Sequence, residues 1–396
     1  MRRGAFGVGT MLVLGCGHPA PSHLVPEPPA PPGPSSACLL GTSGVPAPDT
    51  LTVVVPQSDS AAVAAANEFD TLIRLDCEGR PVPGLASSWA PDSTGTVWTF
   101  VLPDSQVPGA VDVASAWSSS GAALALLSLS GVRAAAPDGR RLVIRLEQPA
   151  ESVPMIFADH ALGVRRHASP RAIVVRSTEG RDARDLVDQS PDVLVTEDPD
   201  VLDYASRRPG TMLTPLPWDR VYVLLLAPGR RPPRELITSD STTFRAQLAR
   251  DAVRSEARTA EPPYWWSDLR GCADSATRVP METGAGAEAS IGYPAGDAAA
   301  RSLAERIVAL GNGSWFARGL AAPELETALR VGAMNAYILP LPIRSLAPCR
   351  DATWPAGAAL VPLVETRRTA ILRKNGPALV VGADGSLRPD ATPGRP

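Results

Sequence analysis

Short runs of apolar residues recur along the chain, separated by turns rich in proline, glycine and aspartate. Runs of this length, either continuous or alternating with polar positions, are typical of buried or half-buried strands. The last part of the chain returns to strands, with a hairpin turn predicted at Asp384–Gly385. The other runs predicted as strands cover residues 51–57, 95–103, 136–149, 171–177, 191–197, 220–228 and 334–342.

Other segments show the apolar spacing of amphipathic helices. Leu303, Ile307 and Leu310 form one stripe, Asp297 is suited to cap the start of that helix, and Gly311 is suited to its end. Helical patterns begin at residue 60 and also cover residues 111–129, 242–258, 297–311 and 323–332. Strands that alternate with short helices predict a layered α/β protein.

Composition excludes few classes of protein. The chain has 396 residues, of which 44% are hydrophobic and 20% charged, and this length allows about two domains. The formal net charge is −3 and no basic patch is evident, which argues against a nucleic-acid partner.

The N-terminus carries the pattern of an export signal. Two arginines precede an apolar run that is too short to span a bilayer, because a span needs about 20 apolar residues. The sequence VLGC, which ends at Cys16, resembles the lipobox of bacterial lipoproteins, in which the cysteine is lipidated. Residues 1–16 are therefore predicted to be a lipoprotein signal peptide; a plain signal peptide is the alternative.

Residues 17–47 are predicted to be a linker. Eight prolines lie between residues 19 and 34, and such a segment favours extended polyproline II over helix or sheet. At about 3.1 Å per residue it would form a semi-rigid stalk of roughly 50 Å. A stalk of this kind would hold an exported domain away from a membrane anchor.

Four cysteines follow Cys16, namely Cys38, Cys77, Cys272 and Cys349. An even number in an exported chain indicates disulfides, and four cysteines allow three connectivities. Their spacing relative to each other and to the histidines does not indicate a zinc site. We therefore expect no metal centre.

Residues 69–89, FDTLIRLDCEGRPVPGLASSW, have a definite strand–turn–strand pattern but no obvious chemistry. This stretch resembles an early motif of the family 5 extracellular solute-binding proteins, the peptide, dipeptide and nickel group of ABC importers. The matching positions are Phe69 to Asp76, Gly79, and Pro83 to Trp89. The family's next strand and helix start are matched by Thr94 to Leu102 and Ala110 to Trp117.

The resemblance, which covers residues 48 to 390, implies a two-lobed periplasmic-binding-protein-like (type II) fold of the α/β class. Mixed sheets would build both lobes, with a cleft between them. The first lobe would comprise residues 48–228 and 355–390, and a shortened second lobe residues 229–354. A disulfide between lobes would clamp a hinge that must open, so this division favours Cys38–Cys77 and Cys272–Cys349.

The function implied by the resemblance is that of an extracytoplasmic, lipid-anchored binding protein. It would act as a monomer that captures peptides or similar small solutes by cleft closure and delivers them to an ABC permease, without a cofactor. Because the second lobe is shorter than is usual in the family, a non-transport descendant acting as a lipid-anchored sensor or structural module is the alternative.

Candidate ligand contacts come from three parts of the chain. Two polar residues follow the first strand, an aromatic cluster lies in the second lobe, and an arginine follows the strand that precedes the cleft in the family. Core packing or surface exposure is the competing interpretation for the aromatic residues and the arginine. The candidates are Gln57, Ser58, Tyr264, Trp265, Trp266 and Arg344.

An enzyme is the other class of protein to consider. The sequence contains no G-x-S-x-G elbow, no H-E-x-x-H, no P-loop and no G-x-G-x-x-G after a strand. His160 and His167 are the only histidines of the predicted folded part. We therefore expect a binding protein rather than an enzyme.

Overall fold

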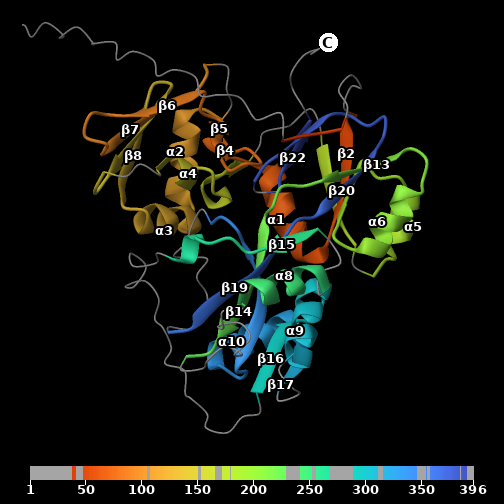
Figure 1. The fold of residues 1–396 in the computed structure, drawn as a ribbon. Coiled ribbons are helices and arrows are strands. Elements are labelled where there is room, and N and C mark those ends of the chain that lie inside the picture. Colours follow the sequence, from red (N-terminus) through yellow and green to blue (C-terminus); the bar gives the residue numbers. More distant parts are fainter. Residues whose placement is uncertain are drawn as a thin grey trace, which may run out of the picture.

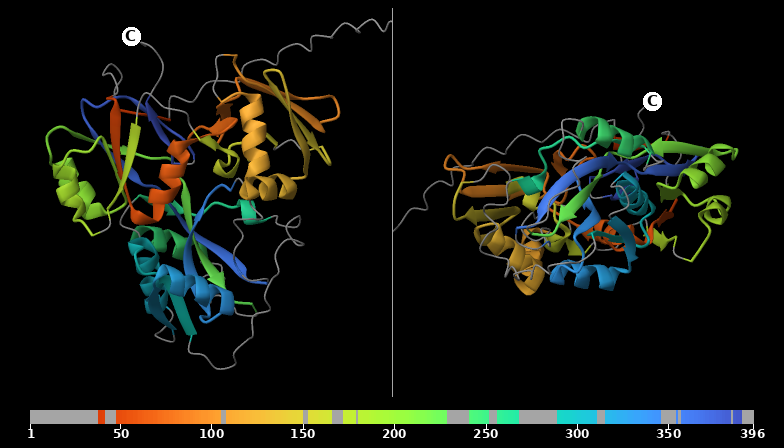
Figure 2. Two further views of the ribbon diagram at one scale, coloured as in Figure 1. Left: turned by 180° about the vertical axis from the view of Figure 1, so that it is seen from behind. Right: turned by 60° about the horizontal axis from the view of Figure 1, so that its bottom comes forward.

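The computed structural model describes residues 38–41, 48–104, 108–149, 153–165, 172–178, 180–228, 241–251, 256–267, 289–310, 315–345, 354, 357–383 and 385–389. These residues form an upper and a lower lobe, and the upper lobe consists of two parts that lie side by side (Figure 1). Figure 2 shows the same division from behind. The predicted α/β class with mixed sheets and two lobes is confirmed.

A five-stranded sheet forms one part of the upper, or first, lobe. Its first three strands run parallel, and the fourth runs antiparallel to both of its neighbours. In spatial order the strands are β11 (Ala172–Ser177), β2 (Thr50–Val55), β12 (Val193–Thr196), β20 (Thr369–Arg373) and β13 (Thr211–Pro215).

Helices cover both faces of this sheet. Successive side chains of a strand point to opposite faces, so the apolar residues of its strands form a separate cluster on each face. Val53 and Val55 of β2 belong to one apolar cluster, which includes Val63, whereas Val54 belongs to the cluster on the other face. The helices are α1 (Gln57–Glu68) on the first face and α5 (Ala183–Asp188) and α6 (Pro199–Ser206) on the second.

A small sheet covers the face that carries α1 and ties down the start of the folded chain. It consists of β1 (Leu39–Leu40), β21 (Leu379–Val381) and β22 (Leu387–Pro389). Cys38, directly before β1, forms the predicted disulfide with Cys77. Cys272 and Cys349 lie outside the described residues, so their pairing stays a prediction.

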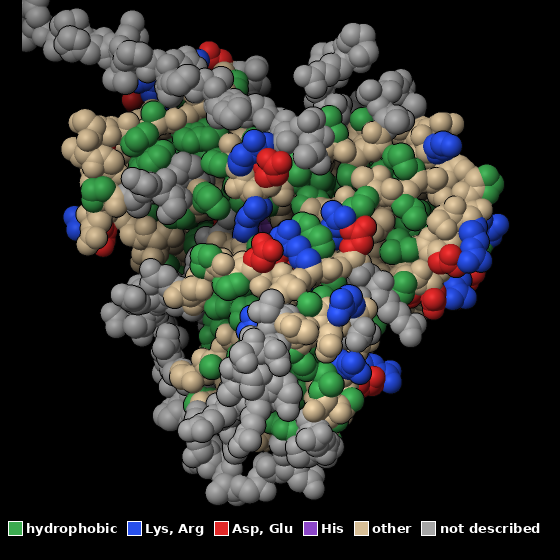
Figure 3. All heavy atoms as spheres, viewed as in Figure 1, with side chains coloured by type: hydrophobic (Ala, Val, Ile, Leu, Met, Phe, Trp, Pro, Cys, Tyr) green, Lys and Arg blue, Asp and Glu red, His purple; other side chains and the backbone are tan. Residues whose placement is uncertain are grey.

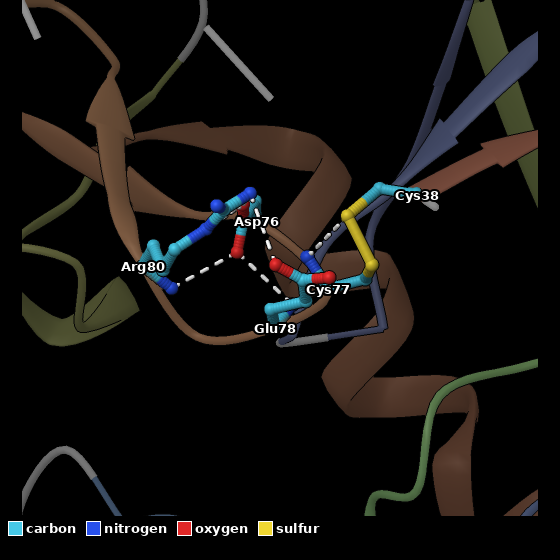
Figure 4. Close-up of a disulfide and its surroundings, with 5 residues drawn as sticks. All are labelled: Cys38, Asp76, Cys77, Glu78 and Arg80. Carbon is cyan, nitrogen blue, oxygen red and sulfur yellow. Dashed lines mark hydrogen bonds and ion pairs between the residues drawn. A yellow bond between two sulfur atoms is a disulfide. The ribbon is translucent and has the colours of Figure 1, made fainter. Parts of the chain in front are cut away.

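Figure 4 shows this disulfide beside a tight turn. Asp76 is buried and accepts hydrogen bonds from the amides of Glu78 and Arg80, both at 2.9 Å. It also pairs with the Arg80 guanidinium at 2.7 Å. The disulfide therefore attaches β1 to a turn whose backbone is already held by one carboxylate.

The second part of the first lobe has its own core. Phe157 is fully buried, lies edge-on to Phe100 at 5.0 Å and stacks on Trp117 at 5.5 Å. The strands are β6 (Ser88–Pro91), β7 (Val97–Val101), β9 (Arg141–Leu146) and β8 (Val132–Asp138) in one sheet, with the pairs β3 (Phe69–Asp70)/β10 (Val164–Arg165) and β4 (Ile73–Leu75)/β5 (Pro81–Pro83). The helices are α2 (Ala110–Ser119), α3 (Gly121–Leu129), α4 (Val153–Ile156) and the 3-10 helix η2 (His160–Leu162).

The segment from residue 69 to 89 has a structural role in this part. The amides of Leu85 and Ala86 donate to the carbonyls of Thr71 and Leu72 at 2.9 and 3.0 Å. A Cβ on Gly84 would lie 2.3 Å from the Thr71 carbonyl oxygen, so only glycine allows the two backbones to approach this closely. The motif is therefore a backbone contact rather than a site of chemistry.

Among the described helices, none is by itself long and apolar enough to cross a membrane. Helices α2 and α3 reach the required length and composition only as a pair, and they meet at a bend of 96°. Buried residues such as Val113 and Trp117 turn one side of the pair toward the core of the first lobe.

A six-stranded sheet forms the lower, or second, lobe. Helices α8 and α9 cover one face, and α10 covers the other together with an aromatic segment that contains Tyr264 and Trp266. In spatial order the strands are β15 (Ala257–Thr259), β19 (Ala359–Thr366), β14 (Arg220–Leu226), β18 (Ala336–Pro342), β16 (Ala289–Pro294) and β17 (Trp315–Leu320). The helices are α8 (Ser241–Asp251), α9 (Ala298–Leu310), α10 (Ala322–Val331) and the 3-10 helix η3 (Trp265–Ser267).

The sheets divide the chain at different positions from the predicted lobes. Residues 220–226 and 359–366, which were predicted to lie in the first lobe, form β14 and β19 of the six-stranded sheet. The connections between the sheets are therefore residues 216–219, between β13 and β14, and residues 367–368, between β19 and β20. An apolar pattern predicts a strand but not the sheet that the strand joins.

Candidate functional site

The strand order of the first lobe creates a crevice where the two lobes meet. Helix α1, which follows β2, packs on one face of the sheet, whereas α6, which follows the neighbouring parallel strand β12, packs on the other. The chain therefore leaves the carboxyl ends of these two strands in opposite directions. In open α/β sheets this arrangement leaves a crevice at the strand ends, which is where ligands commonly bind.

A cavity of about 60 Å³ lies at this crevice. By the same measure one water needs about 10 to 15 Å³, so the cavity has room for a small chemical group rather than a whole peptide. Its walls are mostly apolar, and both connections between the sheets contribute to them. The lining includes Val55, Val195, Leu216, Trp218, Arg344 and Arg368.

Ion pairs join the lobes beside the cavity. Arg368, in the second connection, pairs with Asp59 in the first turn of α1 and with Asp219 in the first connection. Arg220, which begins β14, lies 3.3 Å from Asp59 and 3.6 Å from Glu197, which directly follows β12. Charged side chains of both signs gather at the middle of the molecule, where the lobes meet (Figure 3).

A fourth carboxylate completes this charged cluster from the second lobe. The hydroxyl of Tyr222, on β14, donates to Asp297 at 3.0 Å, and Asp297 also accepts a hydrogen bond from the Ala300 amide at 2.9 Å, at the start of α9. Four carboxylates, of Asp59, Glu197, Asp219 and Asp297, thus accompany the two guanidinium groups of Arg220 and Arg368. The cluster has an excess of two negative charges when all six groups are ionised.

The burial of this cluster changes its titration. Burial raises the pKa of Glu197, and the negative charge of Asp297 adds to this effect against the opposing effect of Arg220. Burial, followed by the charges of Glu197 and Asp297, raises the pKa of Tyr222 well above its ordinary value. Tyr222 therefore remains a hydrogen-bond donor at neutral pH, and the site disfavours further negative charge.

Three of the predicted site residues lie at this crevice. Gln57 and Ser58 are the first two residues of α1, directly after the carboxyl end of β2. Arg344 lines the cavity just after β18, and its guanidinium lies against Gly79 of the first lobe. Their contact with a ligand stays a prediction, and the sequence did not identify the charged residues that lie at the same place.

The predicted aromatic residues form a second group. Tyr264 is buried and stacks on Trp266 at 4.6 Å, while Trp265 lies 5.4 Å from Trp266 and 5.6 Å from Trp354. Trp265 and Trp266 belong to a 3-10 helix, and both are half-buried. Neither their rings nor that of Tyr264 line the cavity.

The aromatic group is nevertheless connected to the crevice. The indole nitrogen of Trp265 donates to the carbonyl oxygen of Pro342 at 2.9 Å, and Pro342 lines the cavity. The hydroxyl of Tyr264 donates to Glu365 at 2.7 Å, one residue before the end of β19. The aromatic segment therefore contacts both the cavity wall and a strand that leads to the second connection.

The residues missed by sequence reasoning are Asp59, Glu197, Asp219, Arg220 and Arg368. Apart from Asp59, which lies in the first turn of α1, they are charged residues at or directly beside the end of a buried strand, as in DR at 219–220 and RR at 367–368. Four other residues considered from the sequence, Cys16, His167, Cys272 and Cys349, lie outside the described part of the chain. Among the described residues, no group of three or more His, Cys, Asp or Glu is arranged to hold a metal ion.

Comparisons with known proteins identify the fold. No protein-family model matches the sequence, and no curated protein matches it. Among solved structures, NikA from Brucella suis in complex with Fe(III)-EDTA aligns over 86% of this chain and 100% of its own, with 12% identity and a TM-score of 0.61. A dipeptide binding protein from Pseudoalteromonas in complex with Met-Leu aligns over 86% and 98%, with 12% identity and a TM-score of 0.59.

A third solved structure, the binding protein AgaA from A. tumefaciens in complex with agropinic acid, aligns over 82% of this chain and 93% of its own. Its identity is 13% and its TM-score 0.55. The chain therefore has the fold of the periplasmic solute-binding proteins. The resemblance to the family 5 members of that class, stated from the sequence, is confirmed at the level of the fold.

Proposed function

We propose that this protein is an extracytoplasmic solute-binding lipoprotein that captures peptides or similar small solutes for an ABC permease. The observation that supports this most is the crevice at the carboxyl ends of β2 and β12, which lies between the lobes and is lined by both connections. The solved structures with this fold carry small solutes of different chemistry, so the fold alone does not select the ligand.

Closure of the lobes would bind a solute through groups from both sides. Asp219, Arg344 and Arg368 line the cavity, and Asp59 and Glu197 of the first lobe and Asp297 of the second lie in the ion-paired cluster beside it. The excess of carboxylates favours a ligand with a positively charged group, such as the amino end of a peptide. Closure excludes water, and the lower local dielectric strengthens these interactions.

The remaining parts of the proposal concern location and partners. Lipidation of Cys16 would anchor the protein, and residues 17–47 would connect the anchor to β1 of the first lobe. A permease in the membrane would then recognise the closed form, which the ligand favours through contacts made only in that form. The protein would act by binding and release, without chemistry of its own.

The test is to identify the solute that the protein carries. Protein exported and purified under native conditions would be analysed by native mass spectrometry, and the released small molecules would be identified. We expect a stoichiometric solute whose removal changes the distance between the lobes. Failure to find a solute, together with an unchanged inter-lobe distance across a library of peptides and small cations, would favour the sensor or structural module instead.

A matched pair of variants links the solute to the crevice. Ala383 lines the cavity, and Ala383→Phe would fill part of it. Val174, on the edge strand β11, is exposed, and Val174→Phe adds a similar aromatic side chain outside the cavity. We expect loss of the bound solute only in Ala383→Phe; equal retention in both variants would place the solute elsewhere.

A further inference from the structure

Both connections between the lobes meet at one tryptophan. Trp218 lies in the first connection, and Arg367 in the second places its guanidinium carbon 4.8 Å from the centre of the Trp218 ring. Arg258, on the edge strand β15 of the second lobe, places its guanidinium carbon 4.5 Å from the same centre. A single ring therefore contacts a cation from each of two other chain segments.

Carboxylates fix both of these arginines. Arg367 pairs with Glu256, just before β15. Arg258 pairs with Glu365 on β19, with its Nη2 and Nε at 2.6 and 2.7 Å from Oε2. Because each arginine is held by a carboxylate from another segment, neither can leave the Trp218 ring without breaking an ion pair as well.

Glu365 connects this group to the aromatic segment. It is buried, and its second oxygen accepts hydrogen bonds from the Tyr264 hydroxyl at 2.7 Å and the Glu261 amide at 3.3 Å. Burial, and then the hydrogen bond to Glu365, raises the pKa of Tyr264, so this hydroxyl remains a donor. All four groups that face Glu365 therefore come from β15 and the segment that follows it.

The contacts around Trp218 lie at the two connections between the lobes, so they restrict the motion of one lobe relative to the other. A hinge between lobes works through dihedral changes in a few residues of the connecting segments. Here the two connections are tied to each other through Trp218 and Arg367, and to the second lobe through Arg258 and Glu365. Rotation of one connection relative to the other would separate charged and aromatic groups that are now in contact.

We propose that Trp218, Arg258, Arg367 and Glu365 form a clamp at the hinge that holds the two connections at one angle in the protein without ligand. The clamp does not depend on which solute binds. Its effect is to narrow the range of lobe arrangements, and opening or closing would require the Trp218 contacts to rearrange. Because Trp218 also lines the cavity, a bound group there would contact the clamp directly.

The test measures the distribution of distances between the lobes in the ligand-free, full-length mature protein. Spin labels on unnatural amino acids at the exposed positions Leu124, on α3, and Val331, on α10, avoid the cysteines. Double electron–electron resonance would report the width of the distribution. Trp218→Leu removes the aromatic face, whereas Trp218→Phe keeps one, and Arg258→Gln removes one cation.

We expect a narrow distribution in the wild type and in Trp218→Phe, and at least a twofold broader one in Trp218→Leu and Arg258→Gln. Arg301→Gln is the control, because Arg301 pairs with Glu305 on the exposed side of a single helix, α9. A distribution as narrow as that of the wild type in folded Arg258→Gln or Trp218→Leu would overturn the proposal. If Trp218→Leu does not fold, Arg258→Gln alone decides.

Discussion

The guanidinium group of Arg344 lies directly against Gly79, in the turn that carries Cys77. A Cβ on Gly79 would come within 2.5 Å of Nη1 of Arg344. Arg344 follows β18 of the second lobe, whereas Gly79 belongs to the first, so this contact crosses the boundary between the lobes beside the cavity. The absence of a side chain at Gly79 leaves the space that Arg344 occupies.

Replacing Gly79 with alanine should therefore move Arg344. Gly79 has a φ of +78°, so Gly79→Ala should lower the free energy of unfolding by about 1 kcal/mol through backbone strain alone. The arginine tip is flexible and should swing away from the cavity at little further cost. Gly139→Ala is the matched control, since Gly139 has a φ of +59° and open space around it.

Urea denaturation and inter-lobe distances would separate the two effects. We expect both variants to lose similar stability, but only Gly79→Ala to change the distance between the lobes. An unchanged distance in Gly79→Ala would mean that the Arg344 contact does not influence the arrangement of the lobes.

The Cys38–Cys77 disulfide should contribute substantially to stability. It closes a loop with a sequence separation of 39 residues, for which the chain-entropy model gives about 4 kcal/mol. Cys38→Ala/Cys77→Ala should lower the free energy of unfolding in urea by about this amount and release β1 from the small sheet. If the double variant unfolds at the same urea concentration as the oxidised wild type, the bond makes no net contribution.

The strands of the fold could be predicted because burial follows the alternation of side chains. Residues 193–196 and 220–226 are almost entirely buried, and their apolar runs are evident in the sequence. The alternation of apolar and polar residues does not indicate which sheet a strand joins. Thr366 and Thr369 are separated only by two arginines, yet the first ends a strand of the second lobe and the other begins a strand of the first.

The candidate site was predictable only where residues directly follow a buried strand in the sequence. Gln57 and Ser58 follow a buried strand, and this position led to the crevice. Asp59, one residue further, pairs with Arg368, which is 309 positions away in the sequence. No local pattern reports a pair at such a separation, so the charged cluster emerges only from the folded structure.

Glu197→Gln should change the pH dependence of stability. Because the folded state raises the pKa of Glu197, the folded protein binds more protons than the unfolded chain between the ordinary value, about 4.3, and the raised one. Stability should therefore fall as pH rises through this window, and the full penalty should apply above it. The variant should be the more stable protein at neutral pH and equal to the wild type near pH 4.

Glu305→Gln serves as the control for this experiment, because Glu305 is exposed and pairs with Arg301 on the same helix. Unfolding free energies from pH 4 to pH 8 should show the same slope for the wild type and this control. If the free energy of unfolding of Glu197→Gln depends on pH as steeply as that of the wild type, the ionisation of Glu197 does not cause the loss of stability.

Cys16→Ala should separate the protein from the membrane if the lipobox is used. The wild type, expressed with its N-terminal signal in a bacterial host, should partition into the detergent phase of Triton X-114 and incorporate labelled palmitate. The variant should lose both properties and remain uncleaved or become soluble. Equal partitioning of the two proteins would favour the plain signal peptide.

Asp59→Asn should weaken the junction between the lobes, because Asp59 is the carboxylate that pairs with both arginines of the cluster. The side chains of Arg220 and Arg368 are only 16% and 11% exposed, so water can replace the lost partner only in part. We expect the free energy of unfolding to fall by about 2 kcal/mol, the range for hydrogen bonds to charged groups.

Asp112→Asn isolates the part of this loss that comes from the start of a helix. Asp112 also lies in the first turn of a helix, α2, but it is exposed and accepts a hydrogen bond from the Gly109 amide at 2.9 Å. Loss of a negative charge at a helix start costs about 0.3 to 1 kcal/mol. Urea denaturation should therefore show a clearly larger loss for Asp59→Asn; equal losses would mean that the ion pairs with Arg220 and Arg368 do not hold the lobes together.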